Sequence, residues 1–259
     1  TEGPTCDAQG TVFFTDQPND RILKWSLEEG LCTFLQPAGR ANGLYFDPWG
    51  HLIACADEKN ELWSIAPDGT VSVLVGEYEG KRLNGPNDVW VRPDGALYFT
   101  DPFYQRSWWT HDTMPQDGQH VYFLAADRQQ LMRVVDDMQK PNGIIGTPDG
   151  KTLYVSDIGA GKTYRYDIAP DGGLAGKTLA AEQGSDGMTL DNEGNLYLTG
   201  DGVVVFDRIG RQIDHIQVPD EQWTANVSFG SKDRQTLFIT ASTGLYAVRM
   251  RVTGANAAK

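Results

Sequence analysis

The chain has 259 residues, and its 35 acidic against 22 basic side chains give a formal charge of −13. This balance leaves no basic stripe for phosphates, so nucleic acid and anionic membranes are excluded as expected partners. No apolar run reaches the ~18 residues of a transmembrane helix. With 40% hydrophobic residues and 29 glycines, the composition predicts a soluble, turn-rich globular protein with a sizeable core.

The elements predicted along the chain are hairpins of one recurring type. Each has a short apolar strand, a turn rich in Pro, Asp and Gly, and a second strand rich in Leu, Tyr, Phe and Val. In chain order they cover residues 2–16, 42–55, 87–101, 142–157, 186–200 and 226–240. Their starts lie roughly 40–55 residues apart, the period of a four-stranded propeller blade. We therefore predict one domain over residues 1–259, an all-β, six-bladed β-propeller.

The two ends of the chain are less regular than the repeats. After Asn226 there is room for three strands up to Thr253, and residues 254–259 have the composition of a disordered tail. An N-terminal strand often completes the last blade, but here the first repeat begins at residue 2, which leaves the closure of the ring open. Because the sequence starts at Thr1, we expect that an upstream segment was removed, and cytoplasm and periplasm both remain candidate compartments.

The three cysteines, Cys6, Cys32 and Cys55, are too scattered for a disulfide framework or a zinc site. We expect them to be small hydrophobic residues in the core, with a single bridge as the alternative.

The residues that open the repeats point to a metal site. In a blade, the innermost strand begins and the second strand ends on the same face, so six opening residues ring one end of the channel. All six carry carboxylate or amide oxygens: Glu2, Asn42, Asn87, Asn142, Asp186 and Asn226. Turn preference explains one or two such residues but not all six. Two carboxylates with neutral oxygens suit one divalent cation, Ca²⁺ first, with Zn²⁺, Mg²⁺ and Mn²⁺ as alternatives.

Five short strings together resemble one protein family, the gluconolactonase branch of the SMP-30/gluconolactonase/luciferin-regenerating-enzyme family. The resemblance spans nearly the whole chain, and the combination is specific although each string is short. The strings are residues 2–4 (EGP), 81–88 (KRLNGPND), 98–104 (YFTDPFY), 140–143 (KPNG) and 185–187 (SDG).

The resemblance implies residue roles. In that family, a glutamate in the first blade, the Asn of Pro-Asn-Gly and the Asp of Asp-Gly bind the cation, and the Asn of Asn-Asp adds a further oxygen. At the matching positions stand Glu2, Asn142, Asp186 and Asn87, with Asp186 also as general base and Asn87 also facing the substrate.

The chain departs from the family pattern at two places. Ala56-Asp57 replaces a common Glu-His pair, and Gly85 stands where related proteins have an arginine. Arg82, further back, is then the candidate for the sugar contact.

The long connection over residues 102–118 has more aromatic residues than a solvated loop needs. Residues 102–118 follow the second strand of the third repeat, so they should overhang the ring of oxygens. We expect a lid or pocket wall here, with substrate contacts from Tyr104, Trp108, Trp109 and His111. Packing of the loop against the neighbouring blade is an equal alternative.

Taken together, the residues predict a metal-dependent hydrolase that opens a sugar lactone to the aldonic acid. The alternatives are a phosphotriesterase-like hydrolase on the same metal site, and a non-enzymatic sugar-binding or scaffold propeller with a structural ion. The carboxylate of Asp186, which can act as a base, favours an enzyme. No Gly-x-Ser-x-Gly motif offers a serine nucleophile. We expect a monomer or weak homo-oligomer acting on a small molecule.

Overall fold

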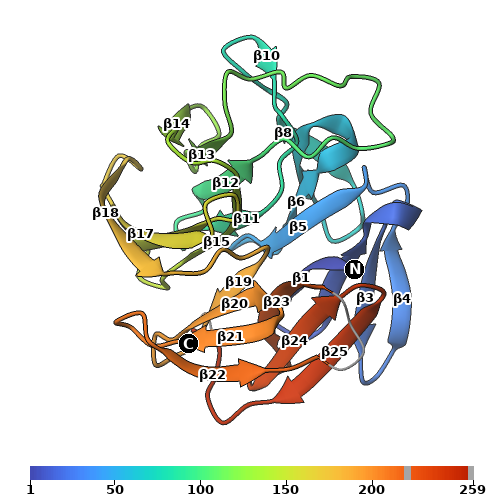
Figure 1. Cartoon of the computed structure of the whole chain (residues 1–259). Helices are drawn as coiled ribbons and strands as arrows, with labels where there is room; N and C mark the ends of the chain where they lie inside the picture. Colours follow the sequence, from blue (N-terminus) through green and yellow to red (C-terminus); the bar gives the residue numbers. More distant parts are fainter. Residues whose placement is uncertain (219–222, 256–259) are drawn as a thin grey trace.

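The computed structural model describes residues 1–218 and 223–255. These residues form β-strands, with two short 3-10 helices, η1 (Gln17–Asn19) and η2 (Asp57–Lys59), and no α-helix among them. Six antiparallel sheets surround a central axis (Figure 1). The predicted six-bladed β-propeller is therefore confirmed.

Within each blade the strands pair in chain order, with the first strand nearest the axis. Blade 1 contains β1 (Glu2–Cys6), β2 (Val12–Asp16), β3 (Arg21–Ser26) and β4 (Gly30–Leu35). Blade 2 contains β5 (Ala41–Phe46), β6 (Leu52–Ala56), β7 (Glu61–Ile65) and β8 (Val71–Val75), and blade 3 contains β11 (Val89–Val91), β12 (Leu97–Asp101), β13 (His120–Leu124) and β14 (Leu131–Val135). Blade 4 contains β15 (Pro141–Gly146), β16 (Thr152–Asp157), β17 (Lys162–Ile168) and β18 (Leu174–Ala181). Blade 5 contains β19 (Met188–Leu190), β20 (Leu196–Gly200), β21 (Gly202–Phe206) and β22 (Gln212–Ile216), and blade 6 contains β23 (Thr224–Gly230), β24 (Thr236–Ala241) and β25 (Gly244–Arg249). A two-stranded ribbon, β9 (Glu77–Tyr78) and β10 (Lys81–Arg82), lies outside the blades.

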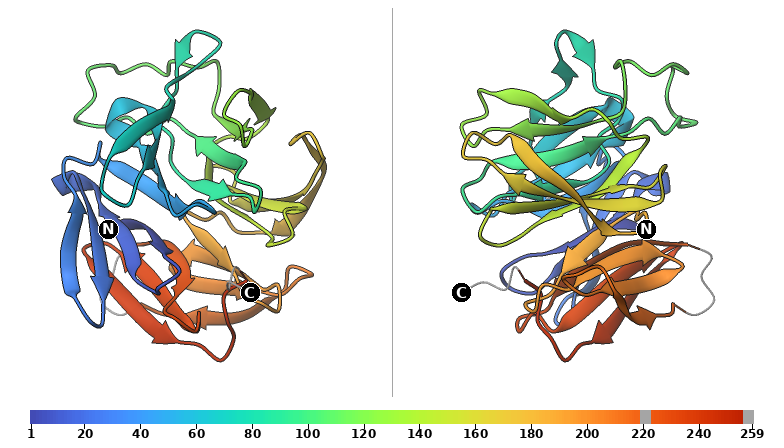
Figure 2. Two further views of the ribbon diagram at one scale, coloured as in Figure 1. Left: turned by 180° about the vertical axis from the view of Figure 1, so that it is seen from behind. Right: turned by 60° about the vertical axis from the view of Figure 1, so that its left-hand side comes forward.

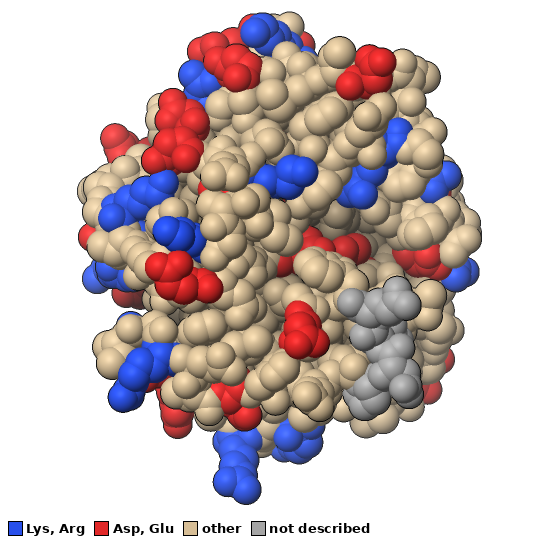
Figure 3. Space-filling model, viewed as in Figure 1, with Lys and Arg blue, Asp and Glu red and all other residues tan. Residues whose placement is uncertain are grey.

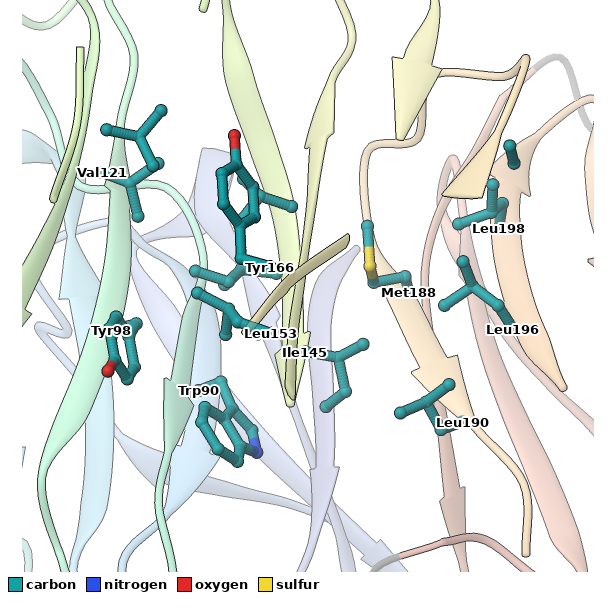
Figure 4. Packing of buried hydrophobic residues seen from close by; sticks show 14 of the residues in the cluster. Trp90, Tyr98, Val121, Ile145, Leu153, Tyr166, Met188, Leu190, Leu196 and Leu198 are labelled. Carbon is teal, nitrogen blue, oxygen red and sulfur yellow. The ribbon is translucent and has the colours of Figure 1, made fainter. Parts of the chain in front are cut away.

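The core lies between neighbouring sheets. Figure 4 shows one cluster, in which Trp90 and Tyr98 of blade 3, Ile145 and Leu153 of blade 4, and Met188 of blade 5 pack together. Burial of each such side chain contributes about 1.5–3 kcal/mol. The alternation of apolar residues in the predicted hairpins therefore fixes the stacking of the blades.

The innermost strands are irregular where they enter the channel. Strand pairing shifts register between Glu2 and Thr5, between Ala41 and Leu44, and between Pro141 and Ile144. Bulges of this kind re-aim side chains. They occur at the residues that open the repeats, so these residues turn toward the axis instead of continuing the pleat.

Glycines after the opening residues bring neighbouring blades into close contact. The backbone N–H of Gly43 donates to the carbonyl oxygen of Asn87 at 2.7 Å. A Cβ atom on Gly187 would overlap the side chain of Asn226, which is buried. The ring of opening residues is therefore held by direct contact from one blade to the next.

This contact predicts the effect of Gly187→Ala. The added methyl group has no room, so we expect the free energy of unfolding to fall by about 1–3 kcal/mol in urea titrations. Gly76→Ala is the matched control, since its Cβ would meet only the Glu61 side chain at 3.5 Å, an ordinary contact distance. Equal stability of the two variants would contradict the prediction.

The ring closes without a strand shared between the first and last blades. In the described residues blade 6 has three strands, and β1 packs against β23. The Thr1 hydroxyl donates to the Gly244 carbonyl oxygen at 2.6 Å, and Arg234 Nη2 donates to the Asp7 carbonyl oxygen at 2.7 Å. A groove of about 520 Å³, partly lined by Trp25 and Phe238, runs along the outside of this junction.

Two expectations about the chain ends and cysteines can be compared with the structure. The predicted disordered tail is wrong for Gly254 and Ala255, because their N–H groups bond to the carbonyl oxygens of Arg234 and Leu190. Residues 256–259 lie outside the described residues.

Cys6 and Cys55 are buried and Cys32 is partly buried, all as free thiols. No helix among the described residues is long and apolar enough to cross a membrane.

Candidate metal and active site

The opening residues gather at one end of the channel, as the blade topology predicts. Asn42, Asn87, Asn142 and Asn226 are buried there, and Glu2 and Asp186 are partly exposed. Figure 3 shows acidic side chains inside the central hollow of this face and basic side chains on its rim. The ring therefore combines a buried layer of amides with two accessible carboxylates.

Glu2 and Asp186 lie close enough to repel each other. Burial and then the charge of Asp186 raise the pKa of Glu2 well above its usual value. Burial also raises the pKa of Asp186, opposed by hydrogen bonds from Trp223 and Asn142. Two carboxylates held together in this way are costly without a cation between them.

Asn142 is oriented with its oxygen unpartnered. Its Nδ2 donates to the Tyr104 hydroxyl at 2.8 Å, while its Oδ1 is buried without a hydrogen-bond donor among the described residues. A buried polar atom without a partner calls for an explanation. A cation bound by this oxygen and the two carboxylates would satisfy it, so the donor set fits a hard divalent ion.

Asn87 and its neighbour occupy the next layer. Asn87 is 4% exposed, and its backbone is fixed by bonds to Thr100 and Gly43. Asp88 accepts from its own chain at Val89 N (2.9 Å) and from Ile144 N (3.3 Å). Burial raises the pKa of Asp88 to about 8. Asp88 belongs to the Asn-Asp string, but sequence reasoning used only its first residue.

A cavity of about 670 Å³ fills the channel on the inner side of the ring. Asp88 and Asn226 line its ring end, and Pro48, Pro93 and Pro148, from hairpin turns, line the opposite end. The ring is thus one wall of an internal channel, and its other side faces the loop over residues 102–118.

The loop between β12 and β13 lies on the ring side of the molecule. In the side view of Figure 2 it extends on the same side as the N-terminus. The Tyr104 hydroxyl reaches Asn142, and burial followed by the charge of Asp186 raises its pKa to about 12. Tyr104 therefore belongs to the mouth of the channel.

The two tryptophans of the loop differ in their surroundings. Trp109 Nε1 donates to the Asp57 carbonyl oxygen at 3.0 Å, and its ring lies against Gly85. Trp108 lies between two arginines, 4.8 Å from Arg40 and 5.6 Å from Arg106, and its Nε1 is buried without a partner. Trp109 therefore packs against the neighbouring blade, and the role of the loop as a lid or pocket wall stays a prediction.

His111 lies within the loop over residues 102–118, and Arg82 lies on the two-stranded ribbon. His111 stacks on Trp109 at 4.8 Å between centroids, and its ring nitrogens have no partner among the described residues. Burial and then the charge of Arg82 lower the pKa of His111. Arg82 itself is exposed on β10.

Three residues near the site were missed by sequence reasoning. Trp223 Nε1 donates to Asp186 Oδ2 at 2.8 Å. Arg106 Nε donates to Asp57 Oδ2 at 2.8 Å, and the charge of Arg106 offsets part of the rise that burial causes in the pKa values of Glu2 and Asp186. Arg106 lies in the aromatic-rich loop, and Asp57 stands at a position that departs from the family pattern. Both features of the sequence could have marked these two residues as candidates. Nothing in the sequence around Trp223, which lies just before β23, marks it as a site residue.

A family model described as the SMP-30/Gluconolactonase/LRE-like region matches residues 1–243. The chain belongs to this family. A gluconolactonase of Zymomonas mobilis is 29% identical over 98% of this chain and 79% of its own length. A lactonohydrolase of Aspergillus oryzae is 27% identical over 76% of this chain, which spans only 51% of that protein.

Solved structures agree with the family and the fold. A gluconolactonase of Xanthomonas campestris has a TM-score of 0.88 and 33% identity, over 96% of this chain and 85% of that one. A calcium-binding regucalcin of Agrobacterium tumefaciens has a TM-score of 0.78 and 22% identity, over 98% and 90%. At 22% identity, the similarity to the regucalcin shows the fold alone.

Proposed function

We propose that this protein hydrolyses a sugar lactone to the open aldonic acid, with the help of one divalent cation bound at the mouth of the channel. The observation that carries the proposal is the close pair Glu2 and Asp186 beside the unpartnered Oδ1 of Asn142. The names of the relatives, gluconolactonase and lactonohydrolase, support the lactone as substrate class.

The ligands of the proposed cation are Glu2, Asn142 and Asp186, with Asn87 as the fourth. Among the described residues no group of three or more His, Cys, Asp or Glu side chains is arranged to hold a metal ion. A site with two carboxylates and amide oxygens is a site for a hard ion, so we propose Ca²⁺ before Zn²⁺, Mg²⁺ or Mn²⁺. When bound, such an ion supplies Lewis-acid polarisation of an ester carbonyl.

Asp186 is the general base in this proposal. Trp223 Nε1 donates to its Oδ2 at 2.8 Å, and Asn142 also hydrogen-bonds the carboxylate, so two side chains hold its orientation at the mouth of the channel. A carboxylate at this position can accept the proton of an attacking water molecule. The water oxygen adds to the lactone carbonyl carbon and its proton goes to Asp186. The ring C–O bond then breaks, and the same proton passes from Asp186 to the leaving ring oxygen, which gives the acid and a hydroxyl group.

A substrate panel tests this function. The protein is freed of metal by a chelator and assayed with Ca²⁺, Zn²⁺, Mg²⁺ and Mn²⁺ on five- and six-membered sugar lactones and on phosphotriesters. We expect lactone hydrolysis that the chelator removes and a divalent ion restores. Cleavage of phosphotriesters alone would favour the phosphotriesterase alternative, and inactivity on both classes would favour a binding propeller.

The loop provides a separate prediction about specificity. Trp108→Ala should raise KM for lactones by about tenfold or more, because it removes a wall of the mouth. Trp109→Ala should instead lower the free energy of unfolding by about 1–3 kcal/mol, because its indole packs on Gly85 and bonds to Asp57. Steady-state kinetics and urea unfolding of both variants check this. Unchanged kinetics in Trp108→Ala would assign that indole to packing.

A further inference from the structure

The guanidinium group of Arg106 is held by a hydrogen bond at its Nε atom, and its two terminal nitrogens are available for a further partner. Its Nε donates to Asp57 Oδ2 at 2.8 Å, and the side chains of Arg106 and Asp57 are 23% and 3% exposed. Among the described residues, Nη1 and Nη2 of Arg106 have no hydrogen-bond partner. A partly buried guanidinium with free terminal N–H groups can receive a ligand.

Arg106 lies at the mouth of the channel. Its guanidinium carbon is 5.3 Å from the ring centroid of Tyr104, the residue whose hydroxyl accepts from Asn142. The Nζ atom of Lys140 lies 4.5 Å from the same ring, so a second cation accompanies it. Burial raises the pKa values of Glu2 and Asp186, and the charge of Arg106 offsets part of that rise, as expected for a neighbour of the proposed cation ligands.

Asp57 determines where Arg106 points. The same oxygen, Oδ2, accepts from Gln17 Nε2 at 2.8 Å, so two donors from different elements hold the carboxylate. Gln17 belongs to η1 and Asp57 to η2, and both are buried. The Nε end of the Arg106 side chain is therefore anchored, through Asp57 and Gln17, to blades 1 and 2.

Lactone hydrolysis creates an anion where there was none. The substrate ester is neutral, and cleavage of its ring C–O bond gives a carboxylate, a hydroxyl group and a proton that passes to solvent. The planar fork of an arginine matches a carboxylate with two parallel N–H bonds. We propose that Arg106, positioned by Asp57, binds the carboxylate of the aldonate product.

This inference rests on the proposed lactonase function, but its test measures binding of the product alone. Sodium gluconate is titrated into the full-length protein by calorimetry, with Ca²⁺ present and absent. We expect Arg106→Gln to weaken gluconate binding about 10–100-fold, the effect of losing a charged hydrogen-bond donor. Arg106→Lys, which keeps the charge and loses the fork, should be intermediate.

Arg40→Gln is the matched control. Arg40 also lies over the Trp108 ring, but its Nη1 already donates to the carbonyl oxygens of Gln17 and Pro18. We expect this variant to bind gluconate as the parent does. An equal loss in Arg40→Gln and Arg106→Gln would overturn the proposal, since it would indicate a general effect of charge or loop structure.

The role of Asp57 is tested by a double-mutant cycle. Asp57→Asn should weaken gluconate binding in the parent and have no further effect in the Arg106→Gln background, because it acts through Arg106. Effects that simply add would overturn the positioning role.

The outcomes separate this inference from the proposed function. Lactone hydrolysis with the same gluconate affinity in the parent and in Arg106→Gln overturns the anion site and leaves the lactonase. Failure of the parent to bind gluconate overturns the anion site as well. Gluconate binding that depends on Arg106 in a protein inactive on every lactone supports the anion site and refutes the lactonase.

Discussion

Asp186→Asn is expected to lower kcat for lactones by about 10²–10⁴-fold, the usual contribution of a general base. Asparagine keeps the shape and one oxygen, so Ca²⁺ affinity should fall much less than the rate. Calorimetric Ca²⁺ binding and steady-state kinetics on the same preparation check this. A variant that binds Ca²⁺ and hydrolyses lactones at the parent rate would show that Asp186 is only a ligand.

Glu2→Gln is expected to weaken Ca²⁺ binding by at least about 100-fold. Loss of a residue that merely supports a metal ligand costs about 10–100-fold, and Glu2 is proposed as one of only two charged ligands. Glu193→Gln, which removes an exposed carboxylate on a turn of blade 5, is the control and should bind as the parent does. Calorimetry measures both, and parental affinity in Glu2→Gln would remove Glu2 from the ligand set.

Glu2→Gln is also expected to change how the free energy of unfolding depends on pH. The pKa of Glu2 is raised in the folded protein, so without a cation its protonated form stabilises the fold below the ordinary carboxyl pKa. This stability is lost as the pH rises through the raised value. Glu2→Gln should remove that loss, whereas Ca²⁺ should counteract it in the parent because the ion requires both carboxylates ionised.

The hairpin period and the ring could be predicted from the sequence because both depend on short-range pattern. Each repeat has its turn residues between two apolar strands, and the topology of a blade places residues such as Asn42 and Asn142 at the same end without further information. The strand order in each sheet confirms this reasoning.

The contacts around the ring could not be predicted, because they join residues far apart in irregular segments. Arg106 reaches Asp57 from another blade, and Trp223 reaches Asp186 from the segment before β23. No periodic pattern specifies where a side chain from an 18-residue connection will end. The docking of Gly254 and Ala255 was missed for a similar reason, since it joins the chain end to residues far away in the sequence through two backbone N–H groups and the packing of Ala255 against the core.

The junction of blades 1 and 6 gives the proposed cation a mechanical role. No sheet spans this seam in the described residues, and a groove runs along its outside. Glu2 lies on blade 1, while Asn142 and Asp186 belong to blades 4 and 5 or their connection. An ion bound by all three would link blade 1 to blades 4 and 5. Separating the first blade from the others would then require release of the ion.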